Sequence, residues 1–227
     1  MKSVSLQYRY LSANENTIAM WKKNTGIGEI KKEGYYDPLK LALAAGITPP
    51  VSDCVSLLIN ELNGLTRDDP LADILPTQGF HFTFLPLTLP LYKVNEQLPA
   101  KVEQLKNIWT EFHAKKIVIR DLRLVALPSQ LLLAGIPERS AIDMRQSFCE
   151  KILDSDWKDE LLERHTDSPL PAPFWHSTLL RYSAALLPKS VRQFFIEHQT
   201  VNFGDVAGEL ILAKVNYNWT KFYQLPN

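Results

Sequence analysis

The feature of the sequence that most constrains the fold is an order of expected elements that occurs twice. A helix, a strand, a second helix and a pair of strands follow one another across residues 52–134. The same order returns across residues 138–224, without a repeated sequence. Helices and antiparallel sheets that alternate in this way pack in layers around a common core. The order therefore predicts an α+β fold of two pseudo-symmetric lobes, with antiparallel sheets flanked by helices.

Local signals predict the individual elements. Ser52 can cap a helix whose apolar residues recur at helical spacing until Gly64 ends it. The other expected elements are helices at 37–45, 70–75, 95–115, 138–164 and 188–198, and strands at 80–87, 117–126, 130–134, 174–182, 208–215 and 221–224. Residues 1–50 have weak periodicity and are interpreted as an N-terminal extension of unclear role. Residues 51–227 are interpreted as one bilobal domain.

Two of the strand-like runs carry a histidine followed two residues later by a threonine. His81 and Thr83 belong to the first run, and His176 and Thr178 belong to the second. Residues i and i+2 of a strand point to the same face. Each run therefore presents an imidazole and a hydroxyl about 6–7 Å apart along the strand.

Two imidazoles and two hydroxyls are groups that suit the cleavage of a phosphodiester. A neutral imidazole can take a proton from the attacking hydroxyl or water, and a protonated imidazole can give one to the leaving oxygen. Histidine suits both tasks because its ordinary pKa of about 6.5 lies near neutrality. The threonine hydroxyls can donate to the non-bridging phosphate oxygens. His81, Thr83, His176 and Thr178 are therefore the catalytic candidates, and the chemistry requires no metal.

Neighbouring residues have less specific signals. Phe174 has the parity of His176 and is either a side chain that stacks on a substrate base or a core or rim aromatic. Arg181 has the opposite parity and is expected to face away from the site. His198 begins a third His-x-Thr match, but it lies at the end of an amphipathic helix and is interpreted as a surface residue near the helix dipole. His165 lies at the end of the helix expected at 138–164, where it can interact with the helix dipole.

The balance of charged residues restricts the kind of nucleic acid that the protein is expected to bind. Lys and Arg together number 25 and balance 25 Asp and Glu residues, so the formal charge is zero. A protein that binds long nucleic acid through many phosphates usually has a basic excess. The balance favours a nucleotide or short oligonucleotide over a long duplex, although a local basic cleft can exist within a neutral total.

Targeting and metal signals are also lacking in the sequence. The first twenty residues contain no signal-peptide pattern, and no stretch approaches the ~20 apolar residues that span a bilayer. Cys54 and Cys149 lack metal-binding spacing and are expected to be buried thiols in helices. No HExxH or CxxC pattern supports a metal site built on His81 and His176. We therefore expect a cytoplasmic protein without membrane contact, metal or cofactor, and the sequence has no signal for its oligomeric state.

The two motifs resemble those of the two-histidine (2H) phosphoesterase superfamily, which has two His-x-Thr/Ser-apolar motifs on the central strands of two lobes. The separation of 95 residues between His81 and His176 is similar to that family. So is the ending, in which residues 209–215 and 221–225 look like the closing strand pair of the second lobe. The resemblance covers about residues 51–225 and looks greater to an uncharacterised bacterial branch than to the cyclic phosphodiesterase and 2′-5′ RNA ligase branch.

The resemblance implies an active-site cleft between the lobes, with the two histidines and two threonines in the catalytic positions. It also implies metal-independent cleavage of nucleotide or RNA phosphodiesters, often 2′,3′-cyclic phosphates or 2′-5′ linkages. Two alternatives stay open, a module that binds nucleotide or RNA without turnover and a ligase-like reverse reaction. Which histidine acts as acid and which as base is also left open.

Overall fold

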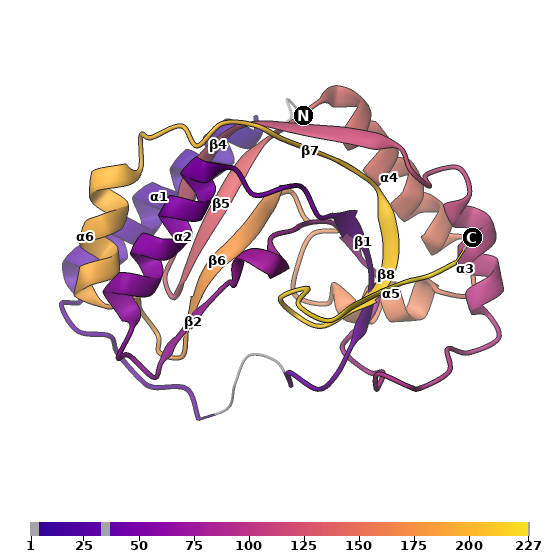
Figure 1. The fold of residues 1–227 in the computed structure, drawn as a ribbon, viewed down its shortest axis with the longest axis horizontal. Coiled ribbons are helices and arrows are strands. Elements are labelled where there is room, and N and C mark those ends of the chain that lie inside the picture. The colour runs from indigo at the N-terminus through magenta and orange to yellow at the C-terminus, as the bar shows by residue number, and fades with distance from the viewer. Residues whose placement is uncertain (1–4, 33–36, 227) are drawn as a thin grey trace.

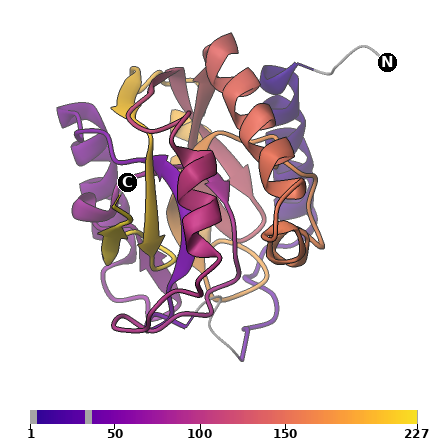
Figure 2. The same ribbon diagram turned by 90° about the vertical axis from the view of Figure 1, so that its right-hand side faces the viewer.

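The computed structural model describes residues 5–32 and 37–226 and contains two antiparallel sheets (Figures 1 and 2). The four-stranded sheet has the order β3-β1-β8-β9, with β3 at Phe82–Pro86, β1 at Ala42–Ile47, β8 at Ile211–Val215 and β9 at Phe222–Gln224. The five-stranded sheet has the order β2-β6-β5-β4-β7, with β2 at Ala72–Ile74, β6 at His176–Tyr182, β5 at Gln130–Pro137, β4 at Lys116–Leu127 and β7 at Val206–Glu209.

Helices lie on both outer sides of the paired sheets. They are α1 (Leu6–Lys23), α2 (Asp53–Thr66), α3 (Val102–Trp109), α4 (Arg139–Leu153), α5 (Lys158–Arg164) and α6 (Lys189–His198), with a 3-10 turn at Thr77–Gly79. In Figure 1, α1, α2 and α6 gather on the left, and α3, α4 and α5 gather on the right. The predicted α+β class with two antiparallel lobes is confirmed.

The assignment of strand pairs to lobes was wrong. The pair β4–β5 precedes β6 in the sequence and lies beside it, in the sheet that carries His176. The closing pair β8–β9 lies in the other sheet, where β1 joins it to β3, the strand that follows His81. Each lobe thus combines a histidine strand from one half of the chain with a strand pair from the other half. Both lobes are therefore built from both halves of the chain.

The chain crosses between the sheets at Leu210. The run 208–215 was predicted as one strand, but β7 ends at Glu209 in the five-stranded sheet and β8 begins at Ile211 in the other. Leu210 is buried between them, and its backbone N–H donates to Lys115 while its carbonyl accepts from Ala114. The crossing backbone is therefore hydrogen-bonded as well as buried.

The described residues before 50 contribute a helix and a central strand to this fold. The helix predicted at 37–45 is wrong, because residues 42–47 form β1, which lies between β3 and β8. The predicted boundary between the N-terminal extension and the bilobal domain, at residue 50, lies just after this central strand. Residues 33–36 fall outside the described part of the chain. The run ALAAGI favours a helix by composition, and its burial in the middle of a sheet overrides that preference.

The long helix α1 went unrecognised because its buried face is partly polar. The buried residues of this helix are Tyr10, Asn14, Thr17 and Trp21. The Asn14 side-chain oxygen accepts from the Ala126 N–H at 2.8 Å, and the Thr17 hydroxyl donates to the Ala126 carbonyl at 2.9 Å. Since β7 pairs only with the first residues of β4, α1 satisfies backbone groups that the rest of this strand leaves unpaired.

Most of the other predicted helices and strands are present, but they begin or end at different residues. The Ser52 hydroxyl accepts from the Val55 N–H and caps α2, which continues past Gly64 to Thr66. The helix predicted at 70–75 is wrong, because β2 occupies it. The helix predicted at 95–115 is limited to α3, and that at 138–164 is divided into α4 and α5.

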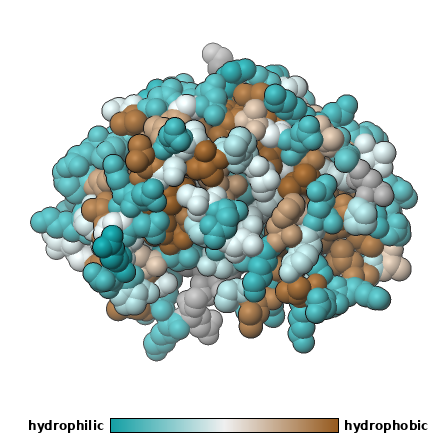
Figure 3. All heavy atoms as spheres, in the orientation of Figure 1, coloured by the Kyte–Doolittle hydropathy of each residue, from teal (hydrophilic) through white to brown (hydrophobic). Residues whose placement is uncertain are grey.

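The core is a continuous cluster of apolar side chains between the sheets and the helices, in which Phe82, Phe84, Trp157 and Trp175 are among the largest fully buried residues. On the face drawn in Figure 3, apolar and hydrophilic residues are interspersed, which is ordinary for a surface in water. Within the described residues, no helix is both long and apolar enough to cross a membrane.

Candidate active site

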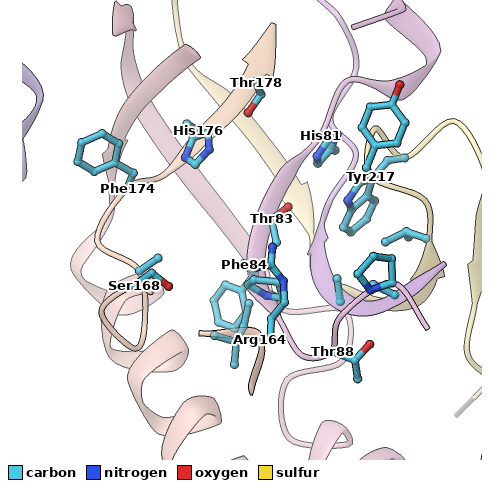
Figure 4. Close-up of a pocket in the computed structure, with 18 of the residues that line it drawn as sticks. His81, Thr83, Phe84, Thr88, Arg164, Ser168, Phe174, His176, Thr178 and Tyr217 are labelled. Atoms are coloured by element: carbon cyan, nitrogen blue, oxygen red, sulfur yellow. The ribbon is translucent and has the colours of Figure 1, made fainter. Parts of the chain in front are cut away.

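A cavity of about 270 Å³ brings the five candidate residues together (Figure 4). His81 and Thr83 line it from the four-stranded sheet, and His176 and Thr178 line it from the five-stranded sheet, with Phe174 just before β6. In Figure 4 the two His-x-Thr segments lie on opposite walls. Side chains separated by 95 residues in the sequence therefore share one site between the lobes.

His81 has a defined tautomer and a fixed ring plane. Its Nδ1 lies 2.6 Å from the Gly79 carbonyl oxygen, which can only accept, so Nδ1 carries the proton and donates. Its ring stacks on Trp219 with centroids 4.9 Å apart and planes 11° apart. These contacts leave Nε2 as an unprotonated nitrogen when the ring is neutral.

The loop that carries Trp219 approaches the site closely, and glycines make room for it. A Cβ on Gly46 would lie 2.7 Å from the Trp219 ring, and a Cβ on Gly79 would lie 2.3 Å from the Asn218 carbonyl oxygen. Trp219 itself has a φ of 57°, which is uncommon for an aromatic residue. Its position against His81 is thus set by a strained backbone that two glycines accommodate, a relation that alternation within single strands did not reveal.

His176 is less constrained than His81. Its Nδ1 is buried and has no hydrogen-bond partner among the described residues. The ring faces Phe174 edge-on, with centroids 6.3 Å apart. Phe174 in turn packs edge-on against Tyr10 at 4.9 Å. Phe174 therefore lines the cavity and also contacts α1, so it has features of both the alternatives that the sequence left open.

Tyr10 connects α1 to the strand that carries His176. Its hydroxyl donates to the Gly135 carbonyl at 2.9 Å and accepts from the Trp175 N–H at 3.0 Å. Burial raises the pKa of this phenol above its ordinary value, so it stays protonated and able to donate. The N-terminal helix thereby holds the residue directly before His176.

We expect Tyr10→Phe to lower the free energy of unfolding by about 1–3 kcal/mol, because it leaves the buried Trp175 N–H without an acceptor. Urea denaturation followed by tryptophan fluorescence measures the change. Tyr8→Phe is the matched control, since Tyr8 lies on the same helix and is exposed. Equal stability of the two variants would contradict this role of Tyr10.

Arg181 lines the cavity, so its predicted outward orientation was wrong. In the pairing of β5 with β6, Leu131 lies opposite Leu180 and Leu132 lies opposite Thr178, which leaves Leu179 as an extra residue. Such a bulge reverses the side-chain parity of the residues beyond it. Arg181 consequently shares a face with His176 and Thr178, and its guanidinium lies 5.2 Å from the centre of the Tyr217 ring.

The cavity is strongly basic although the whole chain is neutral. Three arginines and three histidines line it, namely Arg145, Arg164, Arg181, His81, His165 and His176. Among the described residues, no aspartate or glutamate contributes to its wall. A wall of this composition attracts anions.

Burial also sets the protonation of the two central histidines. Desolvation, together with a smaller effect of the charge of Arg181, lowers the pKa of His81 to about 3 and that of His176 to about 4. The hydrogen bond to Gly79 acts in the opposite direction on His81. Both rings are therefore neutral at pH 7 in the empty cavity.

Comparison with solved structures finds the same fold in other proteins. TT0787 of Thermus thermophilus matches with a TM-score of 0.52 and 14% identity, over 82% of this chain and 95% of TT0787. E. coli LigT, in a structure complexed with 3′-AMP, matches with a TM-score of 0.52 and 14% identity, over 83% of this chain and 95% of LigT. The chain shares the fold of these two proteins. This likeness agrees with the resemblance to the 2H phosphoesterases. No protein-family model matches the chain, and no curated protein matches it in sequence.

The remaining histidines and cysteines were predicted with mixed success. His198 lies outside the cavity, where its Nδ1 is 2.8 Å from the Phe194 carbonyl. His165 follows the last residue of α5, as expected, and it is also buried and lines the cavity. Cys149 is buried as predicted, whereas Cys54 is exposed. Within residues 5–32 and 37–226, no three His, Cys, Asp or Glu side chains are grouped so that they could hold a metal ion.

Proposed function

We propose that this chain is a 2H-type phosphodiesterase that cleaves a cyclic, 2′-5′ or 3′-5′ linked nucleotide or a short RNA. The supporting observation is that His81, Thr83, His176 and Thr178 line one basic cavity from two different sheets. General acid–base catalysis by these histidines needs no metal ion. The cytoplasmic location expected from the sequence belongs to the same proposal.

In this proposal His81 acts as the base. Its Nδ1–H is engaged by Gly79, so Nε2 is free to take the proton of the attacking water or hydroxyl as the new P–O bond forms. His176 gives a proton to the leaving oxygen as the old P–O bond breaks. It becomes protonated when the diester binds, because a phosphate anion raises the pKa of a neighbouring imidazole. The threonine hydroxyls donate to the non-bridging oxygens.

The size and charge of the cavity support a small anionic substrate. A volume of about 270 Å³ is near the lower end of ligand pockets, which typically measure about 300–1,000 Å³. LigT, which shares this fold, has been crystallised with 3′-AMP, a nucleotide of this size class. Phe174 at the edge of the cavity is suited to stack on the base in this proposal.

The direct test is an assay of 2′,3′-cyclic nucleotides, 2′-5′ oligoadenylate and cyclic dinucleotides in the presence of EDTA. We expect turnover of at least one of these diesters at the same rate with and without the chelator. Complete loss in EDTA that zinc or magnesium restores would assign the protein to another mechanistic class. Binding without cleavage of any diester would favour the nucleotide-binding module, and joining of RNA ends would favour the ligase-like reaction.

A further inference from the structure

Two arginines that the proposed reaction does not use line the end of the cavity near α5. Arg164 is the last residue of that helix, and its side chain lines the cavity, where Figure 4 labels it. It is half-buried, and no hydrogen bond or ion pair joins its guanidinium to another described residue. The cavity is therefore lined by a guanidinium whose five N–H donors have no acceptor among the described residues.

Arg145 is the second cation, and it lies deeper in the wall. Its guanidinium stacks 4.0 Å from the centre of the Trp175 ring and donates to the Phe174 carbonyl at 3.3 Å. Only 6% of the residue is exposed. None of the described carboxylates forms an ion pair with it, and burial lowers its pKa to about 10. At neutral pH it remains a buried positive charge without a counter-ion, which is an expensive arrangement in an empty site.

His165 lines the cavity together with the two arginines. The charges of Arg164 and Arg145 both lower the pKa of His165, after the larger effect of its burial. Its Nε2 lies 3.1 Å from the Pro86 carbonyl, and its Nδ1 lies 3.2 Å from the Ser168 hydroxyl. A neutral His165 therefore donates to Pro86 and accepts from Ser168, and it fixes the loop that follows α5.

The scissile diester carries one negative charge, and Arg181 is the arginine whose charge acts on both central histidines. The charge of Arg145 acts on both His176 and His165, whereas that of Arg164 acts on His165. His165, the chain neighbour of Arg164, contacts the carbonyl of Pro86 at the end of β3 that is remote from His81. A single diester next to His81 and His176 would therefore leave the charge of Arg164 uncompensated. Buried charges in proteins are normally paired, so the missing counter-charge belongs to the ligand.

We infer that the α5 end of the cavity, with Arg164 and Arg145, binds a second anionic group of the substrate, a phosphate beyond the scissile diester. The substrate class is then a nucleotide diester that carries an additional phosphate, rather than an unphosphorylated nucleoside cyclic phosphate. This inference rests on the proposed function for the position of the first phosphate. It adds a binding site that no general acid–base argument requires.

Calorimetric binding of three adenosine nucleotides tests the second phosphate site. Adenosine 3′,5′-bisphosphate and adenosine 2′,5′-bisphosphate have two phosphates at different separations, and adenosine 3′-monophosphate has one. We expect the better bisphosphate to bind about 10- to 100-fold more tightly than the monophosphate, the usual effect of added charge-assisted hydrogen bonds. In Arg164→Gln this ratio should fall towards one, and Arg164→Lys should keep part of it.

Arg139→Gln is the matched control, because Arg139 lies on α4, is exposed and pairs with Asp143 along the helix. It should keep the full ratio of affinities. A ratio near one in the unaltered protein, or the same ratio in Arg164→Gln, would overturn the second phosphate site. If either occurred while a diester was still cleaved in EDTA, the proposed function would stand without it. Failure of all three nucleotides to bind, together with no cleavage, would overturn both.

Discussion

Replacing His81 or His176 by alanine should lower the turnover of the preferred diester by about 10²–10⁴-fold, the usual contribution of one general acid or base. The expectation follows from their opposite positions on the walls of one cavity (Figure 4). Turnover under saturating substrate, measured beside a circular dichroism spectrum, separates loss of catalysis from loss of fold. Activity that remained near normal in either variant would contradict the acid–base roles.

The double variant His81→Ala/His176→Ala should lose much less than the product of the two single effects. Groups that act together in one proton-transfer step are non-additive, because removal of one makes the other ineffective. Thr83→Ala and Thr178→Ala should each cost less than loss of a histidine, since each removes one phosphate contact. Multiplicative losses would indicate that the two histidines serve separate steps.

His198→Ala is an internal control for this series. His198 also begins a His-x-Thr tripeptide, but it lies on α6 outside the cavity, stacked on Phe194 with centroids 4.2 Å apart. Its replacement should leave nearly full activity. An inactive but folded His198→Ala protein would contradict the assignment of His81 and His176 as the two catalytic histidines.

Strand alternation located the site residues wherever the strand is regular. His81 with Thr83, and His176 with Thr178, belong to short segments without an inserted residue, so a two-residue period brings each pair to the same wall. Arg181 lies three residues beyond Thr178, and the extra Leu179 between them reverses the parity. A bulge depends on how β5 pairs with β6, and no signal within β6 alone predicts it.

Long-range pairing explains the other errors. Local patterns predicted that β8 and β9 exist, but not that they join β1 and β3 instead of the sheet of β6. The inward face of α1 includes Asn14 and Thr17, whose partners are backbone groups of β4 more than 100 residues away. Apolar periodicity cannot detect a helix whose buried face is partly polar. A role for Arg145 and Arg164 likewise could not be predicted from the sequence, because it depends on the cavity that they line together with residues far away in the chain.

The buried state of His81 should make the protein unstable in acid. An imidazole whose pKa is lowered to about 3 in the folded state takes up a proton near pH 6.5 only when the chain unfolds. The unfolded state therefore binds more protons below pH 6.5, so the stability contributed by this group is complete above that pH. It is lost progressively as the pH falls from 6.5 towards 3. His176 acts in the same direction, because its pKa is also lowered.

Between pH 7 and pH 5 the linkage at His81 should remove about 2 kcal/mol of unfolding free energy. In His81→Gln this part of the loss should disappear, whatever the stability of the variant at pH 7, because glutamine does not titrate. Urea denaturation at the two pH values measures the drop within each protein, and His198→Gln controls for removal of an imidazole outside the cavity. Adenosine 3′-monophosphate should reduce the acid loss in the unaltered protein, since a bound phosphate stabilises the protonated imidazole. An equal drop in His81→Gln and the unaltered protein would mean that His81 is not held neutral by the fold, and the assignment of its Nε2 as the base would lose its basis.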